Sequence, residues 1–433
     1  MDDASKVLTG VAGAAPEGGG NIGAPDGAPT CRYRMPGHYA GLRHAFEAHD
    51  ETGFADLFYQ TFDGLNSGSA RLHGRDVVNF CSYDYLGMCG DPAVSRAAVD
   101  AIGQYGTSVS ASRLVSGERP VHRALERSLA DWVGTEDAIC FVSGYATNAD
   151  VIGHIVGPGD LVIYDSLIHI SVRQGIKVSG AAEHPFPHGR LDVLERLLRR
   201  ARHTAGQVLI VVEGVYSMDG DVPDLARLVA IKQQYDALLM VDEAHSMGVL
   251  GATGRGIGEY CGVAAADVDL WMGTLSKTFV SCGGYIAGRR ELVTYLRYTV
   301  PGFVYSVGLA PPLAAAALAA LGVLRREPER VVRLRARTGL FHSLAAENGL
   351  DIGSANPHSA IVPIMVGQVE AGAWLSRYLL DQDILALPIA FPAVPRNRTR
   401  LRLFISSSHT EAQIRKVAAA LAQGTAEMRR FDA

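Results

Sequence analysis

The sequence predicts an α/β fold, with a mostly parallel sheet between helices and a smaller α+β domain at the C-terminal end. The chain has 433 residues, of which 48% are hydrophobic and 20% charged, enough apolar material for a large core. Up to about residue 310, short apolar runs alternate with helical patterns, as expected where helices cover both faces of a parallel sheet. After the double proline at 311 and 312 the pattern changes to long helices with few strands.

These changes in pattern divide the chain into four segments. Residues 1–30 are rich in Gly, Ala and Pro and have almost no large apolar side chains, so we expect a disordered tail. We interpret residues 31–85 as an N-terminal arm, 86–310 as the large domain and 311–433 as the small C-terminal domain.

Short apolar runs identify the expected strands. In the large domain they are AICFVSG (138–144), DLVIYD (160–165), VLIVVEGV (208–215), LLMVDEA (238–244), DLWMGT (269–274) and GGYIAG (283–288). In the small domain they are SAIVPIMV (359–366) and LRLFIS (401–406). Periodic stretches at 122–133 and 191–201 predict amphipathic helices. The alanine-rich stretch 309–324 is too short, and too close to prolines, for a membrane span, so it predicts a buried helix.

Composition excludes several classes of protein. The net charge is −5, and the basic stretch at 396–402 is too short to indicate nucleic-acid binding. The six cysteines form no CxxC pair and no zinc-ligand spacing with histidine, which favours a reduced cytoplasmic setting without a metal site. The N-terminus lacks the basic start and apolar stretch of a secretory signal.

The most informative pattern is a lysine and an acid that each follow an apolar run. Lys277 lies in GTLSKTF, and Asp242 and His245 lie in VDEAHSMG. A lysine acts as a nucleophile or a base only when it is neutral, whereas a carboxylate that keeps a pyridine ring protonated must stay charged. Pyridoxal phosphate requires both residues, and His245 would then reach the phenolic oxygen of its ring. Taken singly, Lys277 is better explained as a solvated lysine and Asp242 as a helix cap, but these explanations weaken when the two residues are considered together.

Other polar residues follow the predicted strands in the same way. In open α/β sheets, ligands bind beyond the carboxyl ends of the strands, where Asp242, Thr274 and Ser217 are expected. SGYATN (143–148) follows a strand and opens a helix, so the backbone N–H groups of Gly144 and Tyr145 predict a phosphate seat. His169 follows another strand. It is either a structural histidine or an imidazole stacked on the cofactor ring.

In this order, the motifs resemble the alpha-oxoamine synthases, a branch of the fold-type I pyridoxal phosphate enzymes. The resemblance runs from about Asn79 to about His409 and is closest to the serine palmitoyltransferases and 8-amino-7-oxononanoate synthases. It is carried by DYLG (84–87), SRLVSG (112–117) with His122 and Glu126, SGYATN, EGVYSMDGD (213–221), VDEAHSMGVLGATGRG (241–256), GTLSKTF and LRLFISSSHT (401–410).

The resemblance implies a role for each candidate residue. Lys277 would bind the cofactor as an imine, Asp242 would contact the pyridine nitrogen, His245 the phenolic oxygen, and His169 would stack on the ring. Thr274, with the backbones of Gly144 and Tyr145, would bind the phosphate, and Ser217 would line the cofactor. Arg402 would receive a substrate carboxylate. The family also implies a homodimer in which Ser306 reaches the neighbouring phosphate.

The implied reaction is a decarboxylating Claisen-type condensation of a small amino acid (serine, glycine or alanine) with an acyl thioester. The thioester is carried by coenzyme A or by an acyl carrier protein, and the product is an alpha-aminoketone.

Three short segments depart from the family pattern. Tyr83 and Asp84 replace an asparagine before Tyr-Leu-Gly, Ser108 and Ser110 replace glycines, and Ala390 stands near an arginine of bacterial serine palmitoyltransferases. Two other classes stay open: a different fold-type I enzyme, such as an aminotransferase or decarboxylase, and a non-catalytic partner subunit, against which Lys277 argues.

Overall fold

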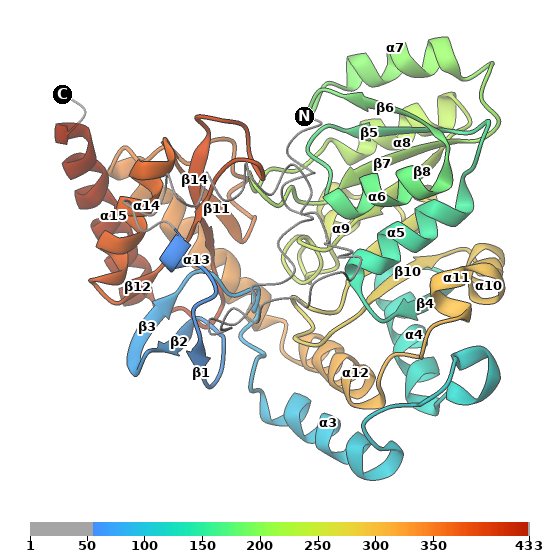
Figure 1. Ribbon diagram of the computed structural model, residues 1–433, viewed down its shortest axis with the longest axis horizontal. Helices are drawn as coiled ribbons and strands as arrows, with labels where there is room; N and C mark the ends of the chain where they lie inside the picture. Colours follow the sequence, from blue (N-terminus) through green and yellow to red (C-terminus); the bar gives the residue numbers. More distant parts are fainter. Residues whose placement is uncertain (1–54, 432–433) are drawn as a thin grey trace, which may run out of the picture.

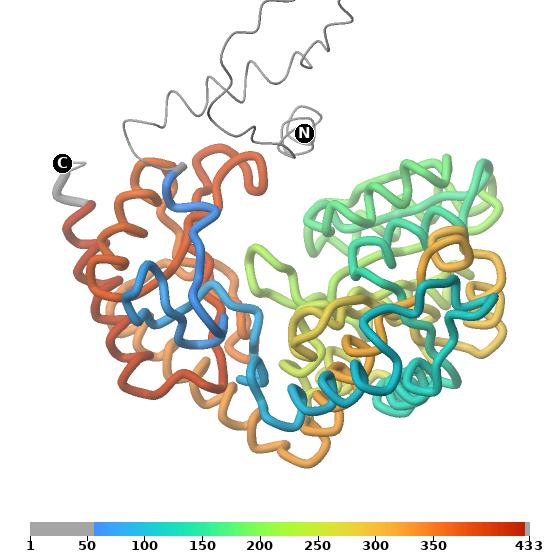
Figure 2. Tube along the Cα trace, turned by 60° about the horizontal axis from the view of Figure 1, so that its bottom comes forward, coloured from blue at the N-terminus to red at the C-terminus, as the bar shows by residue number. Residues whose placement is uncertain are grey.

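The structure is a computed structural model that describes residues 55–431. The predicted tail at 1–30 and the first part of the predicted arm, residues 31–54, lie outside the described residues. The described chain forms two lobes joined by long helices (Figures 1 and 2).

A seven-stranded sheet forms the large lobe, in the order β4-β10-β9-β8-β7-β5-β6. Strand β10 is antiparallel to both of its neighbours, and all other pairs are parallel. Every strand predicted here is confirmed. Strand β6 was missed because four of its five side chains are exposed, so it has no apolar run. The strands are β4 (Asp137–Phe141), β5 (Leu161–Asp165), β6 (Ala182–Phe186), β7 (Val208–Glu213), β8 (Leu238–Asp242), β9 (Leu270–Thr274) and β10 (Gly284–Gly288).

Alternate residues of these strands enter two separate cores, as the two-residue period of a strand requires. Ile210 and Val241 pack with helices α4 (Pro120–Val133), α7 (Leu191–Ala201) and α8 (Leu225–Gln234) on one face. Leu209 and Met240 pack with α5 (Gly144–Ile155), α6 (Ile170–Ser179), α10 (Arg290–Thr299) and α11 (Pro301–Val304) on the other. Helices therefore cover both faces, which confirms the predicted α/β fold.

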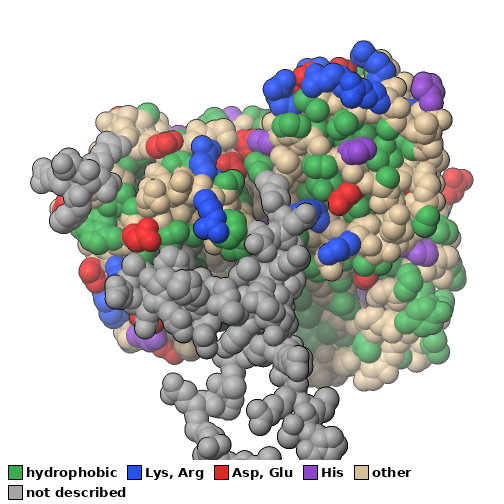
Figure 3. Space-filling view, turned by 45° about the horizontal axis from the view of Figure 1, so that its top comes forward, with side chains coloured by type: hydrophobic (Ala, Val, Ile, Leu, Met, Phe, Trp, Pro, Cys, Tyr) green, Lys and Arg blue, Asp and Glu red, His purple; other side chains and the backbone are tan. Residues whose placement is uncertain are grey.

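Helix α7 shows how the amphipathic pattern is used. Leu191, Leu194 and Leu198 are buried against the sheet, whereas Arg199 and Arg200 are exposed in the last turn. Figure 3 shows Lys and Arg side chains gathered at this end of the large lobe. These arginines occupy the solvent side of a packed helix at the sheet edge, beside β6.

The small lobe is built on an antiparallel sheet in the order β11-β14-β13, with strands β11 (Ile361–Gly367), β14 (Thr399–Phe404) and β13 (Pro388–Ile389). Helices α13 (Glu329–Glu347), α14 (Val369–Leu380) and α15 (Glu411–Phe431) accompany it. Both predicted strands of this region are confirmed.

The N-terminal segment pairs with the C-terminal lobe. Strands β1 (Phe62–Asp63), β2 (Ser69–Leu72) and β3 (Arg75–Asn79) form a second sheet with β12 (Ile384–Leu385), and β3 and β12 are parallel. The short helix η1 (Ala55–Leu57) precedes them. The described part of the predicted arm is thus a layer of the small lobe.

Two long helices join the lobes (Figure 1). Helix α12 (Pro311–Arg326) packs against α3 (Pro92–Tyr105), and its alanines are mostly buried, as predicted. None of the helices in the described part of the chain combines the length and the apolarity needed to span a lipid bilayer. The remaining short helices are α9 (Ile257–Cys261) and η3 (Ala265–Asp267).

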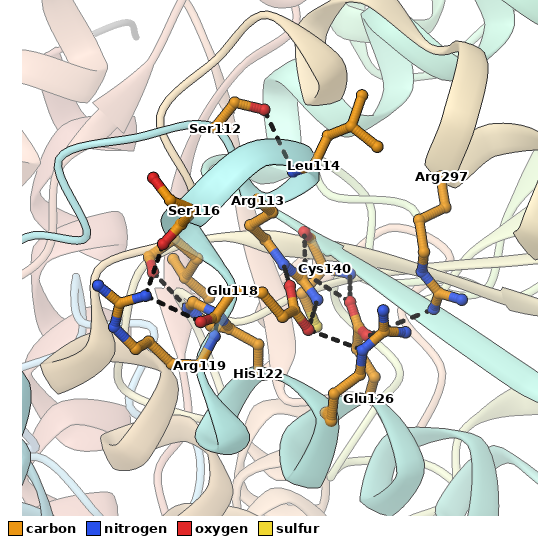
Figure 4. A network of polar contacts seen from close by, with 12 residues as sticks. Ser112, Arg113, Leu114, Ser116, Glu118, Arg119, His122, Glu126, Cys140 and Arg297 are labelled. Atoms are coloured by element: carbon orange, nitrogen blue, oxygen red, sulfur yellow. Dashed lines mark hydrogen bonds and ion pairs between the residues drawn. The ribbon is translucent and has the colours of Figure 1, made fainter.

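The SRLVSG segment forms a short π-helix, η2 (Arg113–Gly117), anchored by a buried ion network (Figure 4). Arg113 Nη1 donates to Glu126 Oε1 at 2.6 Å, and both side chains are almost fully buried. The same Glu126 oxygen accepts from the backbone N–H of Cys140 at 3.0 Å. Arg297 contacts the other Glu126 oxygen at 3.3 Å. This motif therefore holds η2 against α4, β4 and α10.

The network also holds two exposed loops together. Ser112 Oγ donates to the carbonyl of Val304 at 2.6 Å, and the N–H of Gly308 donates to the carbonyl of Ala111 at 3.1 Å. In the first loop, Ser110 has a φ of 51°, a left-handed conformation that glycine adopts more easily. Ser108 accepts the N–H of Ser110 at 3.0 Å, which offsets part of that strain.

We predict that Arg113→Leu lowers the free energy of unfolding by about 3–5 kcal/mol, because it leaves buried Glu126 without its main partner. Urea denaturation measures the change. Arg196→Leu is the matched control, since Arg196 pairs with Asp192 at 2.8 Å but is 54% exposed and does not contact Glu126. The control should cost less than about 1 kcal/mol. Equal losses in the two variants would contradict the role given to the Arg113–Glu126 pair.

Candidate active site

The candidate residues gather beyond the carboxyl ends of three adjacent central strands. Glu213 ends β7, Asp242 ends β8 and Thr274 ends β9, with Lys277 in the turn that follows. Parallel strands bring their last residues to one edge of the sheet, as the sequence predicted. Asp242, Glu213 and Arg402 lie close enough to Lys277 to influence its pKa.

Lys277 lies half-buried beside His245. Its Nζ is 2.9 Å from His245 Nε2, and His245 Nδ1 is 2.7 Å from the hydroxyl of Tyr85. Desolvation lowers the pKa of Lys277 from 10.5 to about 8, although the charges of Asp242 and Glu213 oppose that shift. Burial, followed by the positive charges of Lys277 and Arg402, lowers the pKa of His245 well below its usual range. A neutral imidazole therefore lies next to a lysine that loses its proton easily.

Asp242 is buried and held by two donors. Asn148 Nδ2 donates to its Oδ2 at 2.8 Å, and the N–H of Ala244 donates to its Oδ1 at 2.9 Å. Neighbouring Glu213 is also buried, and its Oε1 has no hydrogen-bond partner in the described chain. Burial, and then the Asp242 charge, raise the pKa of Glu213 well above its usual range. The buried Glu213 carboxyl is therefore harder to ionise than an ordinary glutamate.

His169 is the N-cap residue of helix α6 and is partly exposed to solvent. Its Nδ1 is 2.7 Å from Ser171 Oγ and also accepts the backbone N–H of Ser171 at 3.3 Å. Surrounding protein atoms displace water from the ring and lower the pKa of His169, and Asp242 opposes this shift. Because Asp242 and Lys277 both influence this pKa, His169 belongs to the same site.

Helix α5 starts where the sequence placed a phosphate seat. The first N–H groups of a helix have no partner within it, and here they belong to Gly144 and Tyr145. A Cβ on Gly144 would lie 2.7 Å from Thr274 Oγ1, so the helix start and the end of β9 are in contact. Thr274 Oγ1 is also 2.7 Å from the hydroxyl of Ser276. Backbone N–H groups and two hydroxyls thus meet at one position.

The small lobe supplies Arg402, from strand β14. Its Nη1 donates to the carbonyl of Ser217 at 2.9 Å, and its guanidinium lies 4.7 Å above the ring centroid of Phe404. Its buried Nε has no hydrogen-bond partner in the described chain. Ser217 therefore meets Arg402 through its backbone, and part of the guanidinium remains available to an anion.

The loop that carries Ser217 is fixed on both sides. Asp219 pairs with Arg400 of β14, and Gly220, at a φ of 72°, packs so closely on Ile361 that a Cβ there would clash with its carbonyl. On the other side, His188 contacts Asp165 at 2.9 Å and Asp221 at 2.6 Å. Desolvation opposes these bonds, yet they raise the pKa of His188 to about 10, so the bridge is charged at neutral pH.

Ser306 lies apart from the other candidates. Its hydroxyl donates to the carbonyl of Val307 at 3.3 Å, and within the described chain no interaction joins it to Lys277, Asp242 or Thr274. It lies in one of the two loops that the Arg113 network holds together.

Four residues of the site, Tyr83, Tyr85, Asn148 and Glu213, received no role from the sequence, although Tyr83 was named there as a departure from the family pattern. Tyr83 has Lys277 Nζ 5.6 Å from its ring centroid, and Tyr85 contacts His245. Asn148 donates to Asp242, and Glu213 lies beside Asp242 on the neighbouring strand. Both belong to the motifs SGYATN and EGVYSMDGD, but no spacing rule in the sequence connects either residue with Asp242.

The residues present fit pyridoxal phosphate. The site provides an amine of lowered pKa, a buried carboxylate held by two donors, and an anion seat formed by a helix start and hydroxyls. The unpartnered Arg402 Nε and Glu213 Oε1 are buried polar atoms that a bound molecule is able to satisfy. Lys277 would hold the aldehyde carbon, Asp242 the ring nitrogen, and Gly144, Tyr145 and Thr274 the phosphate.

Comparison with known proteins places the chain among enzymes of this kind. Residues 75–421 match the family described as aminotransferase class I and II. The chain is 43% identical to an 8-amino-7-oxononanoate synthase of Geobacter sulfurreducens over 84% of its own length and 93% of that protein. It is 39% identical to the protein of that name from Geotalea daltonii, over 83% of this chain and 91% of that one.

Solved structures agree with the sequence relatives. A serine palmitoyltransferase of Sphingomonas wittichii superimposes with a TM-score of 0.86 at 29% identity, covering 90% of this chain and 98% of that one. A serine palmitoyltransferase with pyridoxal phosphate gives a TM-score of 0.86 at 30% identity, covering 89% and 97%. With the geometry of the site, these relatives show that the chain belongs to the alpha-oxoamine synthases, a family of fold-type I enzymes that depend on pyridoxal phosphate.

Proposed function

We propose that this enzyme condenses a small amino acid with an acyl thioester, releasing carbon dioxide and the free thiol and giving an alpha-aminoketone. The observation that carries the proposal is the Lys277 amine. Its pKa is lowered to about 8, it lies 2.9 Å from His245, and it shares the site with Asp242 and Arg402. An amine of this kind serves both as the attachment point for a cofactor aldehyde and as a base at neutral pH.

Each residue has a distinct task in this reaction. Pyridoxal phosphate, when bound, supplies an aldehyde that amines attack and a ring that withdraws electrons from the alpha carbon. Asp242 keeps the ring nitrogen protonated, and Lys277 removes and returns the alpha proton. Arg402 receives the substrate carboxylate through its free N–H groups, which orients the bond to be broken. His245 and His169 contact the ring, as the resemblance implies.

The large domain (86–310) thus supplies the cofactor site and the small domain (311–433) the carboxylate site. Glycine, alanine and serine are all small enough to be candidates for the amino acid. Tyr83 lies against Lys277, and Asp84 stands just before Tyr-Leu-Gly, where the family resemblance implies an asparagine. Ala390 stands near the position where the resemblance implies an arginine in bacterial serine palmitoyltransferases. The acyl group arrives on coenzyme A or on an acyl carrier protein.

The active form is proposed to be a homodimer. Around the Arg113 network, Val115 is 82% and Tyr305 86% exposed, with Leu114 and Val307 also exposed nearby. Large apolar side chains gathered on one surface favour a protein partner. A second copy seated there would bring Ser306 towards its cofactor.

The described cysteines are all free thiols, which supports the proposed reducing cytoplasmic setting.

For the lysine, we predict that cofactor attachment to the apoenzyme accelerates with pH and is half-maximal near 8. Because the pKa is lowered from 10.5 to about 8, the reactive neutral amine forms at a pH well below that required by an ordinary lysine. Stopped-flow visible absorbance after mixing apoenzyme with pyridoxal phosphate measures the rate. Lys277→Ala should give no attachment. A midpoint at or above 10.5 would contradict the proposed state of the amine.

For the reaction, we predict that purified holoenzyme releases thiol and carbon dioxide only when both an amino acid and an acyl thioester are present. Matched coenzyme A and carrier-protein thioesters are tested with glycine, alanine and serine separately, and mass spectrometry identifies the aminoketone. Faster turnover with the carrier thioester supports a carrier-delivered acyl group, and equal or better rates with coenzyme A count against it. Amino transfer to a keto acid without any thioester would favour an aminotransferase instead.

For the dimer, we predict that Val115→Asp weakens association, because a carboxylate in an apolar interface loses its hydration. Sedimentation velocity over a concentration series measures the shift towards monomer. Val332→Asp is the control, since Val332 is 60% exposed on α13 of the small lobe. A wild-type protein that stays monomeric at all concentrations would refute the dimer.

A further inference from the structure

A continuous chain of buried hydrogen bonds joins Asp242 to His169. Asn148 Nδ2 is 2.8 Å from Asp242 Oδ2 and 3.0 Å from Ser171 Oγ. Ser171 Oγ is in turn 2.7 Å from His169 Nδ1. Asn148 and Ser171 are both essentially inaccessible to solvent, so water does not compete for these two middle members.

The Asp242 end fixes the direction of the first two hydrogen bonds in this series. An ionised carboxylate only accepts, so the Asn148 amide must present its nitrogen to Asp242. The second N–H of the same nitrogen then points at Ser171 Oγ, which accepts it. A hydroxyl has one proton and two acceptor sites, so Ser171 Oγ could by itself donate to His169 Nδ1 or accept from it. The backbone N–H of Ser171 points at the same Nδ1, which makes this nitrogen an acceptor and the hydroxyl its donor.

A second donor acts on the same ring nitrogen. The backbone N–H of Ser171 also points at His169 Nδ1, at 3.3 Å, because His169 is the N-cap of helix α6. A nitrogen that accepts two hydrogen bonds carries no proton itself. The neutral ring therefore has its proton on Nε2.

We propose that Asn148 and Ser171 are positioning residues that fix the tautomer of His169, so that its Nε2 is a hydrogen-bond donor towards the substrate and not a base. This inference deepens the proposed function and rests on it, because the hydrogen bonds run from Asn148 to Asp242 only if the Asp242 carboxyl is ionised, as the cofactor role requires. It separates two tasks in one site: Lys277 moves the alpha proton, and His169 only donates a hydrogen bond.

Two further observations agree with this assignment. Desolvation lowers the pKa of His169, the charge of Asp242 opposes that shift, and the charges of Lys277 and Arg402 add to it, so the net shift favours the neutral ring. Asn148 Oδ1 is buried without a partner in the described chain. An amide that leaves its oxygen unpaired while using both N–H bonds is oriented by its contact with the Asp242 carboxylate.

The direct test is nitrogen NMR of holoenzyme with ¹⁵N-labelled histidine, where the His169 signals are assigned by their loss in His169→Asn. We expect an unprotonated Nδ1 and a protonated Nε2 at neutral pH. A proton on Nδ1, or an equal mixture of the two tautomers, would overturn the proposal. The NMR spectrum locates the proton without any turnover. An inactive protein can therefore still show the expected tautomer, and an active protein can show the other one. Failure of the tautomer proposal is thus distinguishable from failure of the proposed function.

Variants then identify the residues responsible. Ser171→Ala should shift His169 towards a tautomer mixture and lower kcat/KM about fivefold, the effect of one neutral hydrogen bond. Ser171→Thr should restore both values, since it keeps the hydroxyl. Ser179→Ala is the matched control, because Ser179 is a buried serine of the same helix that bonds only within α6 and its following turn. A Ser171→Ala spectrum identical to wild type would show that the hydroxyl does not set the tautomer.

Discussion

The withdrawal of one lysine amine from water is the constraint on which the site depends. Desolvation penalises the charged form of Lys277, whereas Asp242 and Glu213 favour it, and the balance leaves its pKa at about 8. A fully solvated lysine would be protonated at neutral pH, and one paired directly with a carboxylate would be more strongly so. Here the contact atom is the nitrogen of His245, an imidazole held neutral by its own burial. Nearby acids thus stabilise the site electrostatically without contacting the amine.

The strand register of the central sheet brings the acidic and hydroxyl residues of the site together. Strands β7, β8 and β9 are neighbours and run parallel, so Glu213, Asp242 and Thr274 reach the same edge as consequences of strand register. The second lobe completes the site through β14, whose Arg402 reaches the Ser217 loop. That loop is clamped by Asp219 and Asp221 to opposite partners, so the two lobes meet at a rigid segment.

The parts of the fold that were predictable from sequence are those with strong local signals. The central strands are buried on both faces and appear as apolar runs, whereas β6 lies at an exposed edge and gives none. Pairing of β3 with β12 joins residues about 300 positions apart and leaves no local pattern. In the site, Lys277, Asp242 and His245 were recognisable because each has a chemical role at a strand end. Tyr85 and Asn148 act through contacts with His245 and Asp242 that only the folded chain creates.

The central claim is that the cofactor binds covalently to Lys277 and to no other amine. Borohydride reduction of the holoenzyme traps the attachment, and peptide mass spectrometry then locates the pyridoxyl group. We expect a single modified peptide, which contains Lys277. The visible absorbance should fall in proportion to the amount of this peptide that is recovered. Modification at another lysine, or a coloured protein that cannot be trapped at all, would contradict this claim.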